Sequence, residues 1–294
     1  MVNRILVIAG ATCSGKSRLA IQLAQKLNGE IVSADSATLY QKLDIGTAKP
    51  SKQEQVTIPH HMIDILPPQQ SYSVFDYITQ AKPIVDNLLS QNKTVILCGG
   101  TGLYIKSLLY KNSITPYNFD QNIRTHWTQE LQSKGKEYVY QYLQQIDIET
   151  ANKLSPNDTR RVIRAIEIYQ TTGQKKSQMI QQDGSKNYTF DFFVLDKDRA
   201  ELYQDINTRV DQMVNNGLFD EVKSLYSYKD CQSMQSIGYK EVIQFLDGQL
   251  SYDDTIQLIK KNTRNYAKRQ LTFFRHCSDA IFLTAQNLSQ RFAI

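Results

Sequence analysis

The residues best suited to chemistry form a glycine-bounded run close to the N-terminus. The run reads G-x-x-x-x-G-K-S, with an apolar segment before it and a helical pattern of leucine and alanine after it. This strand-loop-helix context gives the motif its meaning, because glycines let backbone N–H groups converge on phosphate oxygens at a helix N-terminus. The run therefore predicts a phosphate-binding loop of Gly10, Ala11, Thr12, Cys13, Ser14, Gly15, Lys16 and Ser17.

Two side chains of this loop have expected duties. Lys16 would place a positive charge on a β-phosphate, and the Ser17 hydroxyl would hold Mg²⁺, the one cofactor that the sequence predicts. The motif is the one found in ATP-binding proteins, but by itself it does not identify the ligand as ATP.

Two further pieces follow predicted strands. Asp35 and Ser36 end a strand at 31–36, and Gly99-Gly100-Thr101 follows a strand at 94–98. Active sites of open α/β sheets lie at the carboxyl ends of the strands, so both pieces are expected beside the phosphate loop. Asp35 could hold Mg²⁺ or accept a proton from a nucleophile, or it could only cap a following helix. Thr101 could serve the site or belong to an ordinary tight turn.

Arg209 lies at the edge of an apolar helix face in the segment 200–216. A guanidinium beside a buried face needs an anionic partner, because an unpaired buried charge is costly. A bound diphosphate and a structural salt bridge are both consistent with this position.

The elements predicted around these candidate site residues indicate an α/β fold. Strands at 4–9, 31–36 and 94–98 alternate with helices at 16–27 and 73–89, which indicates a parallel sheet with right-handed crossovers. The segment 41–72, rich in proline and glycine, is expected to be a long loop region. From 117 to 189 only helical spacings occur, and a strand then returns at 191–195. We therefore expect an α/β, P-loop NTPase-like core formed by 1–116 and 190–294, with an all-helical insertion domain at 117–189.

Composition narrows the class of protein. The chain has 294 residues and a net charge of +5, and no apolar run approaches the length of a membrane span. The N-terminal apolar segment meets Gly10 at once, which favours a strand over a signal peptide. The four cysteines are far apart, so neither a zinc site nor a disulfide framework is expected. A cytoplasmic protein without membrane contact fits these features.

Two helices carry basic faces. On 158–172, Arg160, Arg161 and Arg164 fall within an arc of about 100°. On 253–276, a stripe about 60° wide contains Lys261, Arg264, Lys268 and Arg275. Each could be a solvated helix face, but two such faces beside a phosphate-binding centre favour contact with a nucleic-acid backbone.

Taken in order, the phosphate loop, D-S, G-T-A-K-P, P-H-H, G-G-T-G-L-Y, N-D-x-x-R and A-K-R-Q resemble one family over nearly the whole chain, from Gly10 to Arg275. The chain is similar to tRNA dimethylallyltransferases of the compact bacterial type, which prenylate the adenine following the anticodon. The resemblance implies that dimethylallyl diphosphate occupies the phosphate loop with help from Arg209. It also implies that Asp35 is the general base, with Thr101 and Lys16 completing the catalytic set, and that the enzyme acts as a monomer.

The same resemblance implies a set of contacts to the anticodon stem-loop of tRNA. They are Asp35, Ser36, Ala37, Thr38, Thr101, Arg124, Arg160, Arg161, Arg164, Gln235, Gly238, Tyr239, Lys240, Arg264, Lys268, Arg269, Gln270 and Arg275.

Three other functions remain to be separated. A small-molecule kinase would have the same phosphate loop but no need of the basic stripe. A prenyltransferase acting on free adenylate would differ only in its acceptor. A non-catalytic RNA-binding module would not need Asp35 together with an intact Lys16-Ser17 pair.

Overall fold

The computed structural model describes residues 4–111, 121–179 and 185–294. The chain divides into two compact units, one formed by Met1–Leu109 with Lys186–Ile294 and the other by Tyr110–Ser185. The second unit therefore begins and ends several residues before the predicted 117–189. Backbone hydrogen bonds join Asn187 to Leu109 and Lys111 to Ser185, so the outgoing and returning chains run together at the boundary.

A six-stranded sheet forms the centre of the first unit, in the order β3-β2-β4-β1-β5-β6 with every pair parallel. The strands are β1 Ile5–Gly10, β2 Gly29–Ser33, β3 His60–His61, β4 Thr94–Gly99, β5 Phe190–Leu195 and β6 Ala280–Leu283. All six residues of β1 are buried, as its unbroken apolar run predicts for a central parallel strand.

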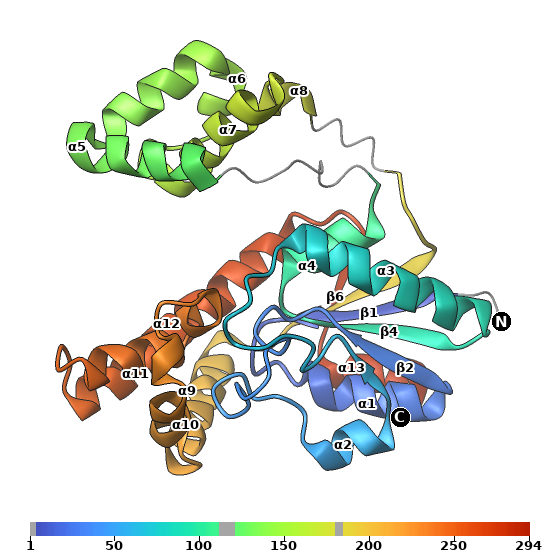
Figure 1. The fold of residues 1–294 in the computed structure, drawn as a ribbon. Helices are drawn as coiled ribbons and strands as arrows, with labels where there is room; N and C mark the ends of the chain where they lie inside the picture. The colour runs from blue at the N-terminus through green and yellow to red at the C-terminus, as the bar shows by residue number, and fades with distance from the viewer. Residues whose placement is uncertain (1–3, 112–120, 180–184) are drawn as a thin grey trace. The chain divides into compact units, whose positions relative to one another are not determined.

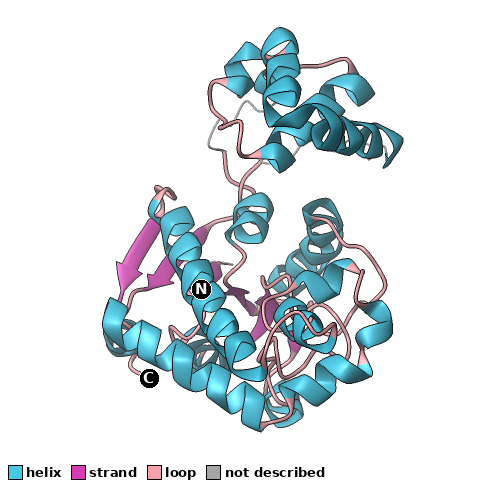
Figure 2. Ribbon diagram, turned by 90° about the vertical axis from the view of Figure 1, so that its left-hand side faces the viewer, coloured by secondary structure: helices cyan, strands magenta, loops and turns pink. Residues whose placement is uncertain are grey.

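Helices cover both faces of this sheet (Figure 1; Figure 2). Helices α3 and α4 lie on one face, and α1 and α13 lie on the other, where Leu19, Leu23 and Leu288 share a buried cluster. The helices of this unit are α1 Lys16–Lys26, α2 Lys52–Thr57, α3 Val74–Ser90, α4 Gly102–Leu109, α9 Arg199–Asn215, α10 Leu218–Ser224, α11 Tyr239–Leu246, α12 Tyr252–Arg275 and α13 Ala285–Phe292, with short 3₁₀ turns at Tyr226–Tyr228 and Gln232–Gln235.

The second unit is built from helices around a core of its own. They are α5 Gln121–Ile146, α6 Ile148–Ala151, α7 Thr159–Thr172 and α8 Lys176–Met179. Gly135, at φ 84°, interrupts α5, and Trp127, Val139 and Ile166 belong to the buried cluster of this unit. Among the residues described in either unit, no helix has both the length and the apolar character needed to cross a bilayer.

The predicted α/β class with a parallel sheet is confirmed, whereas two regions differ from expectation. The expected loop 41–72 contains α2 and β3. Helix α2 buries none of its residues and is held by a capping box between Ser51 and Glu54, so it has no hydrophobic periodicity to reveal it. The edge strand β6 and helix α13 were not predicted. Strand β6, Ala280–Leu283, is only four residues long and so gives a weak pattern.

Candidate active site

The phosphate loop joins β1 to α1 and has the conformation that its glycines allow. Gly10 has φ +154° and Gly15 has φ +90°, and a Cβ on Gly10 would lie 2.7 Å from the Ser14 hydroxyl. Lys16 folds back over the loop, where its ammonium donates to the carbonyl of Ala11 at 3.2 Å. Burial lowers the pKa of Lys16, while the nearby Asp35 acts in the opposite direction. An anion in the loop would compensate this buried charge.

The sheet order brings the other predicted pieces to this loop, because β4 lies between β1 and β2. The Thr101 hydroxyl accepts a hydrogen bond from the N–H of Ser36 at 3.0 Å and donates to the Ser36 hydroxyl at 3.3 Å. A Cβ on Gly99 would lie 2.1 Å from the carbonyl oxygen of Ala34, so only glycine fits this approach. Thr101 thus both precedes α4 and fixes the segment after β2.

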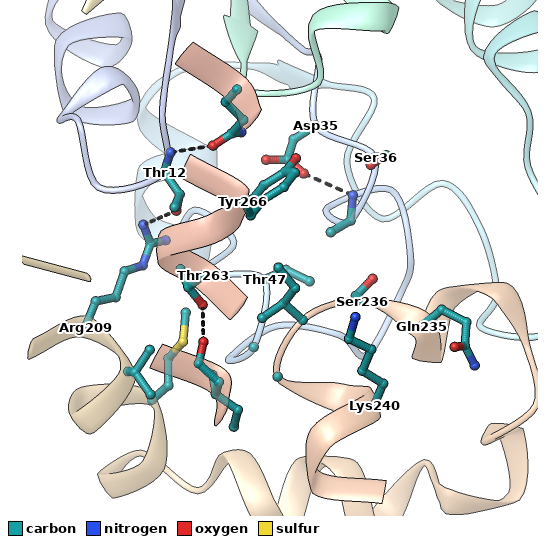
Figure 3. A pocket seen from close by; sticks show the side chains of 18 of the residues that line it. Thr12, Asp35, Ser36, Thr47, Arg209, Gln235, Ser236, Lys240, Thr263 and Tyr266 are labelled. Carbon is teal, nitrogen blue, oxygen red and sulfur yellow. Dashed lines mark hydrogen bonds between the residues drawn. The ribbon is translucent and has the colours of Figure 1, made fainter. Parts of the chain in front are cut away.

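Asp35 is half-buried, and one of its carboxylate oxygens accepts a hydrogen bond from the N–H of Ala37 at 3.0 Å. The next helix after Asp35 begins at Lys52, so the alternative that Asp35 caps a following helix is wrong. The Tyr266 side chain of α12 lies beside Asp35 (Figure 3). Burial, followed by the negative charge of Asp35, raises the pKa of Tyr266.

Gln270, one turn after Tyr266 on α12, ties the two glycine-rich loops together. Its amide oxygen accepts from the N–H of Thr12 at 2.9 Å, and its amide nitrogen donates to the carbonyl of Gly100 at 2.9 Å. The side chain is buried, so both backbone groups depend on it. The sequence did not reveal the duties of Tyr266 and Gln270. The two residues are four positions apart and so lie on one helix face, opposite the basic stripe. This spacing was the feature of the sequence that could have indicated that they face the site.

Arg209 meets the phosphate loop from α9. Its guanidinium donates to the Thr12 hydroxyl at 3.4 Å and to the Cys13 sulfur at 3.6 Å. Among the described residues it has no carboxylate within 4.0 Å, so the salt-bridge alternative finds no support there. The guanidinium is therefore placed to receive an anion lying against the loop.

Arg209 lines three neighbouring cavities. The main cavity, of about 380 Å³, extends from Asp35 and Ser36 to Gln235 and Lys240 (Figure 3). A loop cavity of about 480 Å³ contains Lys16 and Ser17, and a small cavity of about 70 Å³ is lined by Asp35 and Lys16 together. The apolar wall of the main cavity consists of Ile206, Val210, Met213, Ile237 and Ile259. Asp35 and the phosphate-loop residue Lys16 thus line one small cavity, beside a larger cavity with an apolar wall.

The G-T-A-K-P segment forms a further wall, since Thr47 lines the main and small cavities. The carboxylate of Glu221 on α10 holds this segment by accepting hydrogen bonds from the N–H groups of Asp44, Ile45 and Gly46 at 3.0, 2.8 and 3.1 Å. The hydroxyl of Tyr239 donates to the same carboxylate at 2.6 Å. Sequence patterns gave no indication of Glu221, because its acidic side chain looks like any other on a surface helix.

A family model described as IPP transferase matches residues 38–277. The chain belongs to the IPP transferase family. It is 43% identical over 279 residues to the tRNA dimethylallyltransferase of Carboxydothermus hydrogenoformans, covering 94% of this chain and 90% of that protein. The enzyme of the same name from Alkaliphilus oremlandii is 45% identical over 280 residues, covering 94% and 89%.

Solved structures agree with this assignment. The full-length tRNA isopentenylpyrophosphate transferase of Bacillus halodurans matches with a TM-score of 0.74 and 36% identity, covering 99% of this chain and 95% of that one. A eukaryotic dimethylallyltransferase acting on tRNA matches with a TM-score of 0.84 and 32% identity, covering 98% and 75%. The predicted resemblance to tRNA dimethylallyltransferases is confirmed.

Three of the predicted RNA contacts of this chain have structural duties. Tyr239 is fully buried with its hydroxyl on Glu221, and its ring fills the space that a Cβ on Gly46 would need. Thr38 is buried with its hydroxyl 3.1 Å from that of Ser33. Gln270 uses both ends of its amide on backbone groups. Their side chains position the cavity walls, and their contact with RNA stays a prediction.

The other predicted RNA contacts of the first unit differ in how far their side chains are exposed. Lys268, Arg269 and Arg275 on α12 are exposed, as is Gln235. Arg264 donates to the side-chain oxygen of Asn207 at 2.6 Å and is half-buried. Gly238 and Lys240 line the main cavity. The contact of these residues with RNA stays a prediction.

In the helical unit, three of the predicted contacts are engaged with acids, and Arg160 is exposed. Arg124 and Arg164 both meet the buried Glu167, and Arg161 lies 3.3 Å from Asp158. These arginines are therefore held by their own unit.

Proposed function

We propose that this chain transfers the dimethylallyl group of dimethylallyl diphosphate to the exocyclic N6 amine of the adenine 3′ to the anticodon in tRNA, releasing diphosphate. The observation that carries the proposal is the position of Arg209 on the common wall of three cavities, with Asp35 on one side and Lys16 on the other. A donor bound through its diphosphate at the loop would then present its prenyl carbon toward a base lying beside Asp35.

The chemistry follows from these groups. The exocyclic amine is a weak nucleophile because its lone pair is delocalised into the ring. As the amine nitrogen bonds to the primary prenyl carbon, the bond from that carbon to oxygen breaks, and the electron pair leaves with diphosphate. Asp35 takes the proton that the amine loses. Lys16 and Arg209 stabilise the charge that grows on the departing diphosphate.

The target base must leave its stack to reach Asp35. Extrusion is cheapest for a nucleotide already in a single-stranded loop, which favours an anticodon loop over a duplex. The apolar wall of Ile206, Val210 and Met213 suits a prenyl chain and excludes water, the competing nucleophile. The exposed cations of α12 would contact the RNA backbone.

The residues present fit Mg²⁺ as a cofactor. The Ser17 hydroxyl is exposed in the first turn of α1 and lines the loop cavity with Lys16. Mg²⁺ commonly takes one or two protein oxygens together with phosphate oxygens and water. Bound at Ser17 and the diphosphate, the ion would neutralise part of the leaving-group charge. We also propose that a single chain suffices, since Lys16, Asp35 and Arg209, the groups that the proposed chemistry uses, together line these cavities.

The deciding experiment incubates the protein with unmodified tRNA, dimethylallyl diphosphate and Mg²⁺, and analyses the anticodon-loop nucleosides by mass spectrometry. We expect a mass gain of one dimethylallyl group on the adenosine after the anticodon, without consumption of ATP. Free adenylate serves as the second acceptor and should remain unmodified. Transfer of a γ-phosphoryl group from ATP to a metabolite, with no use of the isoprenoid donor, would instead identify a kinase.

A further inference from the structure

The G-T-A-K-P segment, residues 46–50, borders all three cavities. Thr47 lines the main and small cavities, and Ala48 lines the small and loop cavities (Figure 3). The small cavity is the one that Lys16 and Asp35 share, and its volume of about 70 Å³ admits only a few water molecules. The segment thus forms a wall of the space in which the proposed reaction would take place.

The G-T-A-K-P segment needs contacts from other elements to keep its conformation. All five of its residues are half-buried, so none of them lies in the interior of the protein. The backbone of Ala48 has φ 48°, in the left-handed region that residues other than glycine rarely adopt. Such a conformation persists only where surrounding contacts fix it. The position of this wall therefore depends on the contacts that hold the chain on either side of it.

The carboxylate of Glu221 on α10 holds the chain where it enters the segment. One of its oxygens accepts hydrogen bonds from the N–H groups of Asp44 and Ile45, at 3.0 and 2.8 Å. The other accepts from the N–H of Gly46 at 3.1 Å and from the Tyr239 hydroxyl at 2.6 Å. The Tyr239 ring also packs on Gly46, where a Cβ would lie 2.5 Å from it. One side chain thus joins α10 and α11 to the segment.

This place requires a carboxylate. Both oxygens of Glu221 face donors, and each accepts two hydrogen bonds. Glutamine has the same shape, but one end of its amide donates. It would keep two of the four bonds and set an N–H group against the other two donors. The substitution Glu221→Gln is therefore a small change that loosens the segment.

We propose that Glu221 is a positioning residue that keeps the G-T-A-K-P segment in place beside the reaction centre and so excludes water from the prenyl donor. The inference rests on the proposed function, because the donor that the segment shields is dimethylallyl diphosphate. Glu221 lines none of the three cavities, so it acts through the segment.

The reaction that the segment suppresses is hydrolysis of the donor. Exclusion of water from a site prevents side reactions of this kind. A water oxygen would bond to the primary prenyl carbon as the bond from that carbon to the diphosphate oxygen breaks. The electron pair leaves with diphosphate, and the water loses one proton to solvent. The product is dimethylallyl alcohol in place of modified RNA.

The ratio of dimethylallyl alcohol to prenylated RNA tests this inference. Hydrogen bonds to a charged group hold the segment, so their loss in Glu221→Gln should raise the ratio by roughly 10-fold. A purely structural role would leave the ratio unchanged, because transfer and hydrolysis both require the diphosphate to leave and would decline together. Both products would be measured by mass spectrometry in one reaction with dimethylallyl diphosphate, Mg²⁺, a saturating unmodified anticodon stem-loop and isotopically labelled water. The label should enter the alcohol.

Two results would overturn the inference. One is a wild-type ratio in a Glu221→Gln protein whose thermal unfolding shows that it is folded. The other is label in the phosphate product instead of the alcohol, because water would then have attacked phosphorus and not the prenyl carbon.

The matched control is Asp220→Asn, which removes the same charge from an exposed side chain beside Glu221 on α10. Its ratio should equal that of wild type, and a rise as large as that of Glu221→Gln would assign the effect to charge and contradict the inference. Tyr239→Phe keeps the ring on Gly46 and removes one of the four hydrogen bonds, so it should raise the ratio by less. Where Glu221→Gln does not fold, Tyr239→Phe decides, and an unchanged ratio then overturns the inference.

The same reaction separates this inference from the proposed function. Prenylated RNA formed by the wild-type protein tests the function directly. If wild type prenylates RNA and a folded Glu221→Gln protein keeps the wild-type ratio, only the role of Glu221 is wrong. If wild type does not prenylate RNA, the proposed function fails and the inference fails with it.

Discussion

The amide oxygen of Gln270 accepts a hydrogen bond from the backbone N–H of Thr12 at 2.9 Å, although 258 residues separate them. The same side chain donates to the carbonyl of Gly100. One residue of α12 thus fixes the phosphate loop against the loop that follows β4. A Cβ on Gly100 would lie 2.1 Å from this amide, so the two loops approach as closely as glycine permits.

Replacing Gln270 with leucine should therefore disturb both loops. The change leaves the half-buried N–H of Thr12 and the buried carbonyl of Gly100 without partners, and the buried carbonyl alone costs about 1–3 kcal/mol. We expect a lower midpoint of thermal unfolding and a raised KM for dimethylallyl diphosphate. The control Gln270→Glu keeps an acceptor for Thr12 but faces Gly100 with an oxygen, so it should retain only part of the function. A leucine variant with wild-type stability and KM would show that the bridge has no role.

The variant Asp35→Asn tests the general base while preserving the geometry. Asparagine can still accept the hydrogen bond from Ala37 but cannot take a proton from the amine. Turnover should fall by roughly 10²- to 10⁴-fold. Single-turnover prenyl transfer measures this loss, and anisotropy on the same RNA should give an affinity close to that of wild type. A large loss of affinity with normal turnover would assign Asp35 to binding instead.

Lys268 tests the basic stripe of α12. Its side chain is exposed, and removing one phosphate contact from a protein-RNA complex should reduce the salt slope by about 0.9. The variant Lys268→Ala should thus bind RNA more weakly, most visibly at low salt. Lys26→Ala is the matched control, because Lys26 is also exposed but lies at the C-terminal end of α1, away from the phosphate loop. Equal salt slopes for the two variants would indicate that the basic stripe is a solvated helix face that does not contact RNA.

The parts of the site that depend on local patterns could be predicted from the sequence. The phosphate loop is continuous in sequence, and Asp35 and Thr101 follow apolar strands, so the rule for parallel sheets brings them together. The clustering of basic residues on α12 was also visible as a helical period.

What the sequence could not reveal depends on contacts between distant segments. Gln270 and Tyr239 were expected to face RNA, but one bridges two loops and the other is buried against Gly46. Glu221 and Tyr266 gain their duties only when α10 and α12 pack beside the cavity. An acidic or aromatic residue on a helix has the same local signature whether it faces solvent or a site.

The pKa of Lys16 gives a prediction with a definite sign. Burial lowers it below the ordinary value of 10.5 in the free protein, so Lys16 loses its proton at a lower pH than an exposed lysine. Only the protonated ammonium attracts diphosphate, and affinity should therefore decline as pH rises, beginning below 10.5. The ammonium of Lys16 is less favourable in the folded protein than in the unfolded chain, so protonation of Lys16 lowers the free energy of unfolding. This loss of stability is largest at low pH and disappears as pH rises through the same range.

Binding of inorganic pyrophosphate, measured by calorimetry between neutral and alkaline pH, checks this expectation. The ligand also changes its charge in that range, so Lys16→Arg is the necessary control, because a guanidinium stays protonated throughout. Subtracting the pH dependence of the arginine variant leaves the contribution of Lys16 itself. A decline that is identical in the two proteins would assign the whole effect to pyrophosphate and would contradict a lowered pKa for Lys16.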